Sequence, residues 1–119
     1  MVDGLPGLRD ANLLQSALSR PRHSHAYGEQ DLFRLAALYA EAICRNHPFV
    51  DGNKRVGFAA ADLFLYRNGY DLQPTLSDEH ADMIIAMASS KIDAVTLADY
   101  FKKHSLPLQQ STGEDDPTP

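Results

Sequence analysis

Residues 47–55 read HPFVDGNKR and separate two segments that are rich in apolar side chains. Pro48 disfavours the α conformation at His47, so a helix in the first segment is expected to end near Asn46. The turn-forming triplet DGN follows, and a second helix is expected to begin at Lys54. The stretch therefore predicts two apolar helices joined by a short loop that carries a dense set of polar groups.

The turn before the second helix has the features of an anion-binding site. Gly52 can adopt a positive φ and lets a ligand come close to the backbone. The first N–H groups of a helix have no acceptor within it, and they point to a spot where the helix dipole is positive. Lys54 adds a full charge, and the planar guanidinium of Arg55 suits two phosphate oxygens at once. We therefore expect a phosphate group to bind here.

The remaining polar residues of the stretch suit phosphate chemistry. His47 carries an imidazole, which can accept a proton from an attacking hydroxyl group. Asp51 offers a hard oxygen ligand for Mg²⁺, with nucleotide oxygens completing the shell. Asn53 can tie the loop backbone together or donate to a phosphate, and Phe49 is expected to anchor the loop in the core. Each residue alone is more often a capping or packing residue, so the prediction depends on their order and spacing.

The stretch HPFVDGNKR resembles the signature of the Fic/Doc family, H-P-F-x-[D/E]-[G/A]-N-x-R, and the lysine in it resembles the death-on-curing (Doc) toxin branch. Flanking segments are similar too: GLPGLRD near the start, SALSRP at residues 16–21, AYGE before the motif and FLYRNGY after it. The resemblance runs from about residue 4 to residue 104. It implies an all-α fold, a compact Fic-fold helical bundle with a short flap segment over the active site.

The resemblance also implies a reaction. The motif histidine of the family, here His47, is the catalytic base, the acidic residue, here Asp51, binds Mg²⁺, and Gly52, Asn53 and Arg55 hold the phosphates of the nucleotide. Doc-type members transfer the terminal phosphate of ATP to a hydroxyl group of a target protein. Their best-known target is a threonine of elongation factor Tu, and its modification halts translation. The chain is thus expected to be a toxin and a protein Ser/Thr phosphotransferase.

Two positions favour phosphate transfer over AMP transfer. Fic enzymes that transfer AMP have glycine where Lys54 stands, and a second arginine where Phe58 stands. Lysine fills the space for two of the phosphates and adds a charge, so we assign Lys54 to both the catalytic and the phosphate-binding residues. Doc-type chains usually have Thr-Ala in place of Val56 and Gly57. An AMP-transferring enzyme and a catalytically idle module that binds nucleotide or protein therefore remain alternatives.

Composition limits the class of protein. The 119 residues, 44% of them hydrophobic, suffice for one small core. A net charge of −5 argues against direct nucleic-acid binding. Cys44 is the only cysteine, which excludes an internal disulfide, and we expect it to be a core residue. With no apolar run long enough for a membrane span and no signal peptide, we expect a protein of the bacterial cytoplasm.

Hydrophobic spacing predicts five helices, at residues 11–19, 31–45, 54–68, 77–89 and 96–104. Asp10 and Ser77 are expected to cap the first and the fourth helix, and residues 70–74 to form an extended connector. Residues 1–104 are assigned to the Fic/Doc domain, without the first helix of the family. The acidic, proline-rich residues 105–119 are expected to be a disordered tail.

Residues 20–29, RPRHSHAYGE, are expected to form a polar loop. His23 and His25 could share a metal ion, but the absence of a third ligand nearby favours a solvated loop. The resemblance identifies this loop with the flap that docks the target protein. Arg22 and Tyr27 would then face the substrate.

Regulation is inferred from a missing pattern. Many Fic proteins carry an inhibitory helix with the pattern [S/T]-x-x-x-E-[G/N], and the nearest match, residues 75–80, ends in histidine. His80 and His104 are both expected at the surface. The resemblance implies instead a separate antitoxin protein, with a flexible segment that folds into a groove on the toxin.

Overall fold

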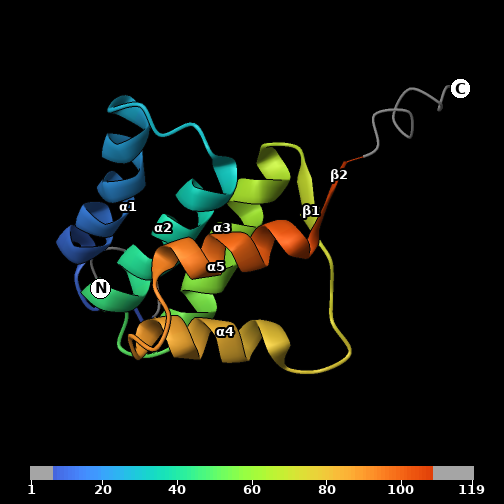
Figure 1. Cartoon of the computed structure of the whole chain (residues 1–119). Helices are drawn as coiled ribbons and strands as arrows, with labels where there is room; N and C mark the ends of the chain where they lie inside the picture. Colours follow the sequence, from blue (N-terminus) through green and yellow to red (C-terminus); the bar gives the residue numbers. More distant parts are fainter. Residues whose placement is uncertain (1–6, 109–119) are drawn as a thin grey trace, which may run out of the picture.

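The computed structural model describes residues 7–108, which form a helical bundle with one small two-stranded sheet (Figure 1). The elements in chain order are α1 (Ala11–Ala26), α2 (Leu32–Asn46), α3 (Asn53–Arg67), β1 (Tyr70–Leu72), α4 (Glu79–Ala88), α5 (Ala94–Lys103) and β2 (Ser105–Pro107). The all-α fold class is therefore confirmed. Within residues 7–108, no helix combines the length and apolarity that a membrane crossing requires.

Helix α2 is the centre of the bundle. It packs against α1, α3, α4 and α5, and most of its residues are buried. Asp31 caps its N-terminus by accepting hydrogen bonds from the N–H groups of Phe33 and Arg34. Small residues bring α2 and α3 close together, since a Cβ added to Gly57 would lie 3.0 Å from the carbonyl oxygen of Ala40. The loop between these two helices is thus held by two elements that cannot shift easily.

Helix α3 is less buried than its apolar composition predicts. Only Gly57, Ala61 and Leu65 are buried, at four-residue spacing on one face. Leu63 is 58% exposed, so the opposite face of α3 carries apolar side chains to the surface. Gly69, with φ 98°, follows the helix and turns the chain into β1.

Helix α1 is longer than expected, because it continues through Pro21 to Ala26. Asp10 caps it as predicted and accepts hydrogen bonds from the N–H groups of Asn12 and Leu13. A proline inside a helix removes one hydrogen bond and usually ends the helix. Here Pro21 is fully buried, and the packing of α1 on α2 offsets that loss. The predicted loop at residues 20–29 is therefore helical over most of its length.

The predicted tail does not begin at Ser105. Ser105–Pro107 form β2, which pairs antiparallel with β1 and places Ser105 opposite Leu72. The extended chain after Gly69 offers backbone groups that only another extended segment can satisfy, and the chain after α5 supplies it. The remainder of the predicted tail, residues 109–119, lies outside the described residues, as do residues 1–6.

The N-terminus of α4 also differs from the prediction. The helix begins at Glu79 after Asp78, and neither Ser77 nor Asp78 caps it with a side-chain hydrogen bond. Asp93 caps α5, where its carboxylate accepts a hydrogen bond from the N–H of Thr96 at 2.8 Å. That bond lowers the pKa of Asp93 below its ordinary value.

Candidate functional site

The loop between α2 and α3 starts with a residue in an unusual conformation. His47 is the C-cap of α2 and lies in the left-handed region, with φ 50° and ψ 54°. Its side chain is exposed, whereas Pro48 after it is fully buried. The buried anchor of the loop is therefore Pro48 and not Phe49, which is only half-buried, because the proline ring follows directly on the turn out of α2. Burial of Pro48 leaves the imidazole of His47 facing solvent.

The side chain of Asn53 closes the loop. Its Oδ1 accepts a hydrogen bond from the N–H of Phe49, and its Nδ2 donates to the carbonyl oxygen of Phe49, both at 3.0 Å. One carboxamide thus satisfies both backbone groups of a residue four positions earlier. Of the two roles considered for Asn53, the structure shows the loop-tying one.

The N-terminus of α3 is open to an anion. Gly52 is the N-cap, with φ 78° and ψ 11°, and it has no side chain to cap the helix. The guanidinium of Arg55 folds back over it, so that a Cβ at position 52 would lie 2.9 Å from Nη2 of Arg55. The first N–H groups of α3, a positive helix end and a guanidinium therefore gather around one glycine. This cradle fits a phosphate group.

Two cavities meet at Lys54. A cavity of about 270 Å³ is bordered by Lys54 and His47, together with Cys44, Arg45, Ala88 and Ser89. A cavity of about 530 Å³ between α3 and α4 is bordered by Lys54 and Arg55 at one end. The lining of this second cavity is mainly apolar and includes Phe58, Ala81, Ile84 and Ile85. Lys54 thus stands between the proposed base and the apolar cavity.

Cys44 is a packing residue beneath the site. It is buried, and burial raises the pKa of its thiol against the opposing effects of Lys54 and Arg45. Its Sγ lies 3.9 Å from the carbonyl oxygen of Asn53, a weak hydrogen bond at most. A thiol kept protonated in this way is not a nucleophile, in agreement with the predicted core role.

Asp51 is exposed beside the phosphate cradle. No group of three or more His, Cys, Asp or Glu side chains within residues 7–108 is arranged to hold a metal ion. If Asp51 holds Mg²⁺, oxygens from a bound nucleotide and from water would have to complete the shell, as is usual for Mg²⁺ in proteins.

A segment that the sequence did not associate with the motif lies directly against it. The guanidinium of Arg9 donates from Nε, at 3.0 Å, and from Nη2 to the carbonyl oxygen of His47. The backbone N–H groups of Arg9 and Asp10 donate to the carbonyl oxygen of Pro48 at 2.7 and 3.1 Å. Residues 9 and 47 are 38 positions apart, and only the GLPGLRD pattern marked this segment as a feature of interest.

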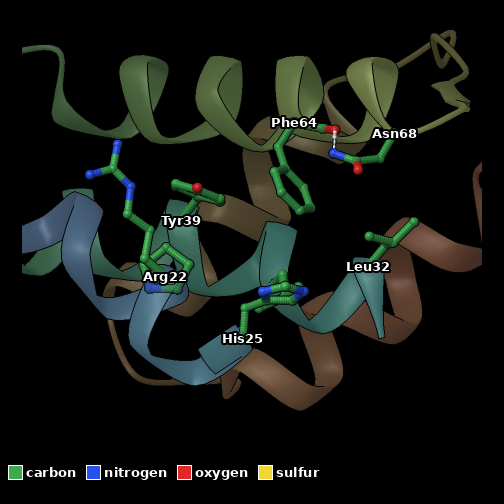
Figure 2. A pocket seen from close by; sticks show the side chains of 8 residues that line it. Arg22, His25, Leu32, Tyr39, Phe64 and Asn68 are labelled. Atoms are coloured by element: carbon green, nitrogen blue, oxygen red, sulfur yellow. Dashed lines mark hydrogen bonds between the residues drawn. The ribbon is translucent and has the colours of Figure 1, made fainter. Parts of the chain in front are cut away.

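The two predicted flap residues lie away from the motif. Arg22 borders a cavity of about 280 Å³ that also involves Tyr39 of α2 and Phe64 of α3 (Figure 2). Figure 2 shows Arg22 reaching from α1 toward α3, while Asn68 near the end of α3 donates a hydrogen bond to the carbonyl oxygen of Phe64. This cavity includes Leu32, the first residue of α2.

The motif lies beyond the opposite end of α2, and a helix of 15 residues is about 22 Å long. Tyr27, 92% exposed, is the C-cap of α1. The described structure therefore does not bring Arg22 and Tyr27 to His47, because residues 20–26 continue α1 and form no flap there. His23 and His25 lie two positions apart on this helix, where side chains point to different sides and cannot share a metal ion.

His80 and His104 are half-buried and bonded, although we expected them to lie at the surface. The ring of His80 stacks on the ring of Phe58, with the two ring centroids 5.4 Å apart, and borders the apolar cavity. Its Nε2 lies 2.7 Å from the carbonyl oxygen of Gln73, which requires a hydrogen on Nε2, and its Nδ1 lies 2.6 Å from the hydroxyl of Tyr100. The turn before α4 brings these groups together, and no sequence spacing indicated it.

Tyr100 and Glu79 complete this group. Burial and the nearby carboxylate of Glu79 raise the pKa of Tyr100 to about 12. Glu79 lies 3.2 Å from Nε2 of His104. The glutamate of the segment compared with an inhibitory helix is therefore engaged at the start of α4 and not at the phosphate cradle.

Comparison with known proteins adds a second line of evidence. The model of the Fic/DOC family matches residues 2–65. The Protein kinase doc of Escherichia phage P1 is 38% identical over 101 residues, which cover 84% of this chain and 79% of that protein. The Toxin Doc of Mycolicibacterium smegmatis is 37% identical over 95 residues, which cover 76% of this chain and 72% of that protein.

Proposed function

This chain belongs to the Fic/DOC family, and from this premise we propose that it is a Doc-type toxin that transfers the terminal phosphate of ATP to a hydroxyl group of a target protein. The observation that carries the proposal is the position of Lys54. It stands at the open N-terminus of α3, and it borders the same cavity as His47 on one side and the same cavity as Arg55 on the other. A phosphate at this point meets positive charge from both sides.

The residues divide the reaction between them. The hydroxyl oxygen of the target attacks the terminal phosphorus, the bond to the bridging oxygen breaks, and ADP leaves with that oxygen. His47 accepts the proton of the hydroxyl group. Lys54, Arg55 and the first N–H groups of α3 bind the phosphate oxygens and stabilise their charge. Positioning supplies much of the acceleration in such a transfer, which suits a loop fixed by Asn53 and by the buried Pro48.

Asp51 would hold Mg²⁺ in this site, with the other ligands coming from the nucleotide and water. The metal ion would neutralise part of the phosphate charge when bound. The exposure of Asp51 beside the cradle leaves it free to face a nucleotide.

Phosphate transfer is supported over AMP transfer by two side chains. The Lys54 ammonium occupies the position of a glycine in AMP-transferring relatives of the family. Phe58, where those enzymes carry a second arginine, stacks on His80 in an apolar cavity and offers no charge to a further phosphate. The arrangement provides charge for one end of the nucleotide only.

The target is proposed to be a translation factor, with elongation factor Tu as the first candidate, and the site of action the bacterial cytoplasm. Restraint is proposed to come from an antitoxin protein. This part of the proposal is supported by Glu79 at the start of α4, whose carboxylate is engaged by His104 and Tyr100.

Intact-mass analysis tests the proposal. The protein is incubated with elongation factor Tu, ATP and Mg²⁺, beside a His47→Ala control. We expect a gain of one phosphoryl group that is absent with the control. A gain of AMP would overturn the role assigned to Lys54. If elongation factor Tu is unchanged, a bacterial lysate is labelled with ATP carrying a terminal ³²P, and no labelled protein there would refute the enzyme itself.

A further inference from the structure

Residues 7–10 run antiparallel to the motif loop, and we call them the strap. The N–H of Val50 donates to the carbonyl oxygen of Gly7 at 2.8 Å, and Leu8 pairs with Phe49 as an isolated bridge. Two more N–H groups of the strap donate to the carbonyl oxygen of Pro48. Three backbone hydrogen bonds therefore join the strap to the loop that carries the proposed base.

The side chain of Arg9 adds a different kind of contact. Its Nε and Nη2 both donate to the carbonyl oxygen of His47, and Nη2 also lies 3.5 Å from the carbonyl oxygen of Asn46. These carbonyl groups are at the end of α2, where the helix itself offers them no donor and where the helix dipole is negative. The guanidinium of Arg9 carries a positive charge and several N–H donors, so it is a favourable partner for the carbonyl groups at the C-terminus of α2.

Arg9 contacts the backbone of His47, the proposed catalytic base. His47 has a Cβ and yet adopts the left-handed conformation, which is unfavourable for such a residue and persists only where its surroundings enforce it. The enforcement comes from two directions. The N–H of His47 donates to Ile43 within α2, and its carbonyl oxygen receives both donors from Arg9. This conformation sets the direction of the Cα–Cβ bond that carries the imidazole.

We propose that Arg9 is a positioning residue: by binding the carbonyl oxygen of His47 it holds the left-handed turn that aims the imidazole at the acceptor hydroxyl. The proposal deepens the function proposed above and rests on it for its kinetic consequences. The alternative is that Arg9 merely caps α2 and stabilises the fold.

Kinetic measurement separates the two roles. Arg9→Met keeps the aliphatic stem and removes all donors, while Arg9→Lys retains one charged donor. Arg67→Met is the matched control, because Arg67 is an exposed arginine in the last turn of α3, at the other end of that helix from the motif loop. With elongation factor Tu and ATP as substrates, Arg9→Met is expected to lower kcat about a hundredfold with KM for ATP changed less than about threefold.

Arg9→Lys is expected to recover part of that loss, and Arg67→Met to keep the kcat of the unmodified chain. An equal loss in the Arg67→Met control, or a loss in Arg9→Met that appears in KM alone, would overturn the positioning role. An Arg9→Lys variant as poor as Arg9→Met would overturn it too, since a single charged donor still reaches one carbonyl oxygen.

Hydrogen exchange gives a readout that does not depend on any substrate. In Arg9→Met the N–H groups of His47 and Val50 are expected to exchange on the order of tenfold faster, while amides of α5 keep their rates. Faster exchange throughout the chain would show that Arg9→Met has lost its fold. The kcat and the loop exchange rates of Arg9→Lys would then decide between the positioning and the capping role. Unchanged exchange rates of the loop amides in Arg9→Met would refute the positioning role, whether or not the proposed reaction takes place. Faster exchange confined to the loop, in a chain that shows no phosphate transfer, would instead mean that the proposed function is wrong and the role of Arg9 in the loop is right.

Discussion

Replacement of Asn53 separates the two tasks of the motif loop. Asn53→Ala removes both hydrogen bonds to Phe49, and at about 0.5–1.5 kcal/mol each they contribute about 1–3 kcal/mol. Alanine is the better helix residue at the start of α3 by about 0.5 kcal/mol, which offsets part of the loss. We therefore expect the free energy of unfolding to fall by about 0.5–2.5 kcal/mol, or the Tm by about 2–12 °C for a domain of this size.

Asn53→Asp keeps the shape and the acceptor of the N–H of Phe49, but it sets a carboxylate oxygen against the carbonyl oxygen of Phe49. The positive end of α3 and Lys54 stabilise that charge, so stability is expected to stay closer to that of the original chain. A phosphate, however, would meet a negative charge in its cradle, and ATP affinity is expected to fall at least about tenfold.

Urea unfolding followed by circular dichroism and titration calorimetry with ATP measure the two effects. We expect opposite orders, with the alanine variant the less stable and the aspartate variant the weaker binder. Equal stability of Asn53→Ala and the original chain would refute the loop-tying role of the carboxamide. Equal ATP affinity in Asn53→Asp would show that the phosphate does not bind at the N-terminus of α3.

Three further predictions concern the helices around the site. Gly57→Ala places a Cβ 3.0 Å from the carbonyl oxygen of Ala40, so it is expected to lower the free energy of unfolding by about 1–2 kcal/mol in spite of the better helix propensity, as measured by urea unfolding. Tyr100 is expected to ionise near its pKa of about 12. Because the folded state disfavours the phenolate, the free energy of unfolding should fall as the pH rises from 10 toward 12. Unfolding measured at alkaline pH should show a smaller fall for Tyr100→Phe. Burial, and to a smaller extent the charge of Asp71, raise the pKa of Asp62 above its ordinary 3.8. The protonated carboxyl therefore favours folding, and this contribution is lost as the pH rises above 3.8. Thermal unfolding should accordingly show Asp62→Asn to be more stable than the original chain at pH 7, with no gain at about pH 3.

Local chemistry predicted the centre of the molecule well. The helix end before Pro48, the turn at the DGN triplet and the start of a second helix are all decided by neighbouring residues, and the structure places them within one residue of the expected positions. The central place of α2 followed from its apolar faces. Asp10 caps its helix as predicted, because a short acceptor before an apolar segment has the same geometry in any fold.

The remaining features depend on contacts that sequence spacing does not encode. Pro21 stays inside α1 because tertiary packing overrides its local preference. The strand at residues 105–107 exists only because residues 70–72 offer it an edge. Arg9 reaches His47 across 38 positions, and His80 reaches Tyr100 across 20, so neither contact has a local signature. The prediction of a loop at residues 20–26 is wrong for the same reason, since the packing of α1 on α2 keeps these residues helical in spite of their polarity.

Lys54 borders two cavities with a single ammonium group. A ligand that engages it from the apolar side between α3 and α4 withdraws that charge from the side of His47. Occupancy of either cavity then weakens occupancy of the other, and thermodynamic reciprocity makes the factor the same in both directions. Arg55 of the phosphate cradle borders the apolar cavity too, so a ligand that fills this cavity would compete with nucleotide for both cations.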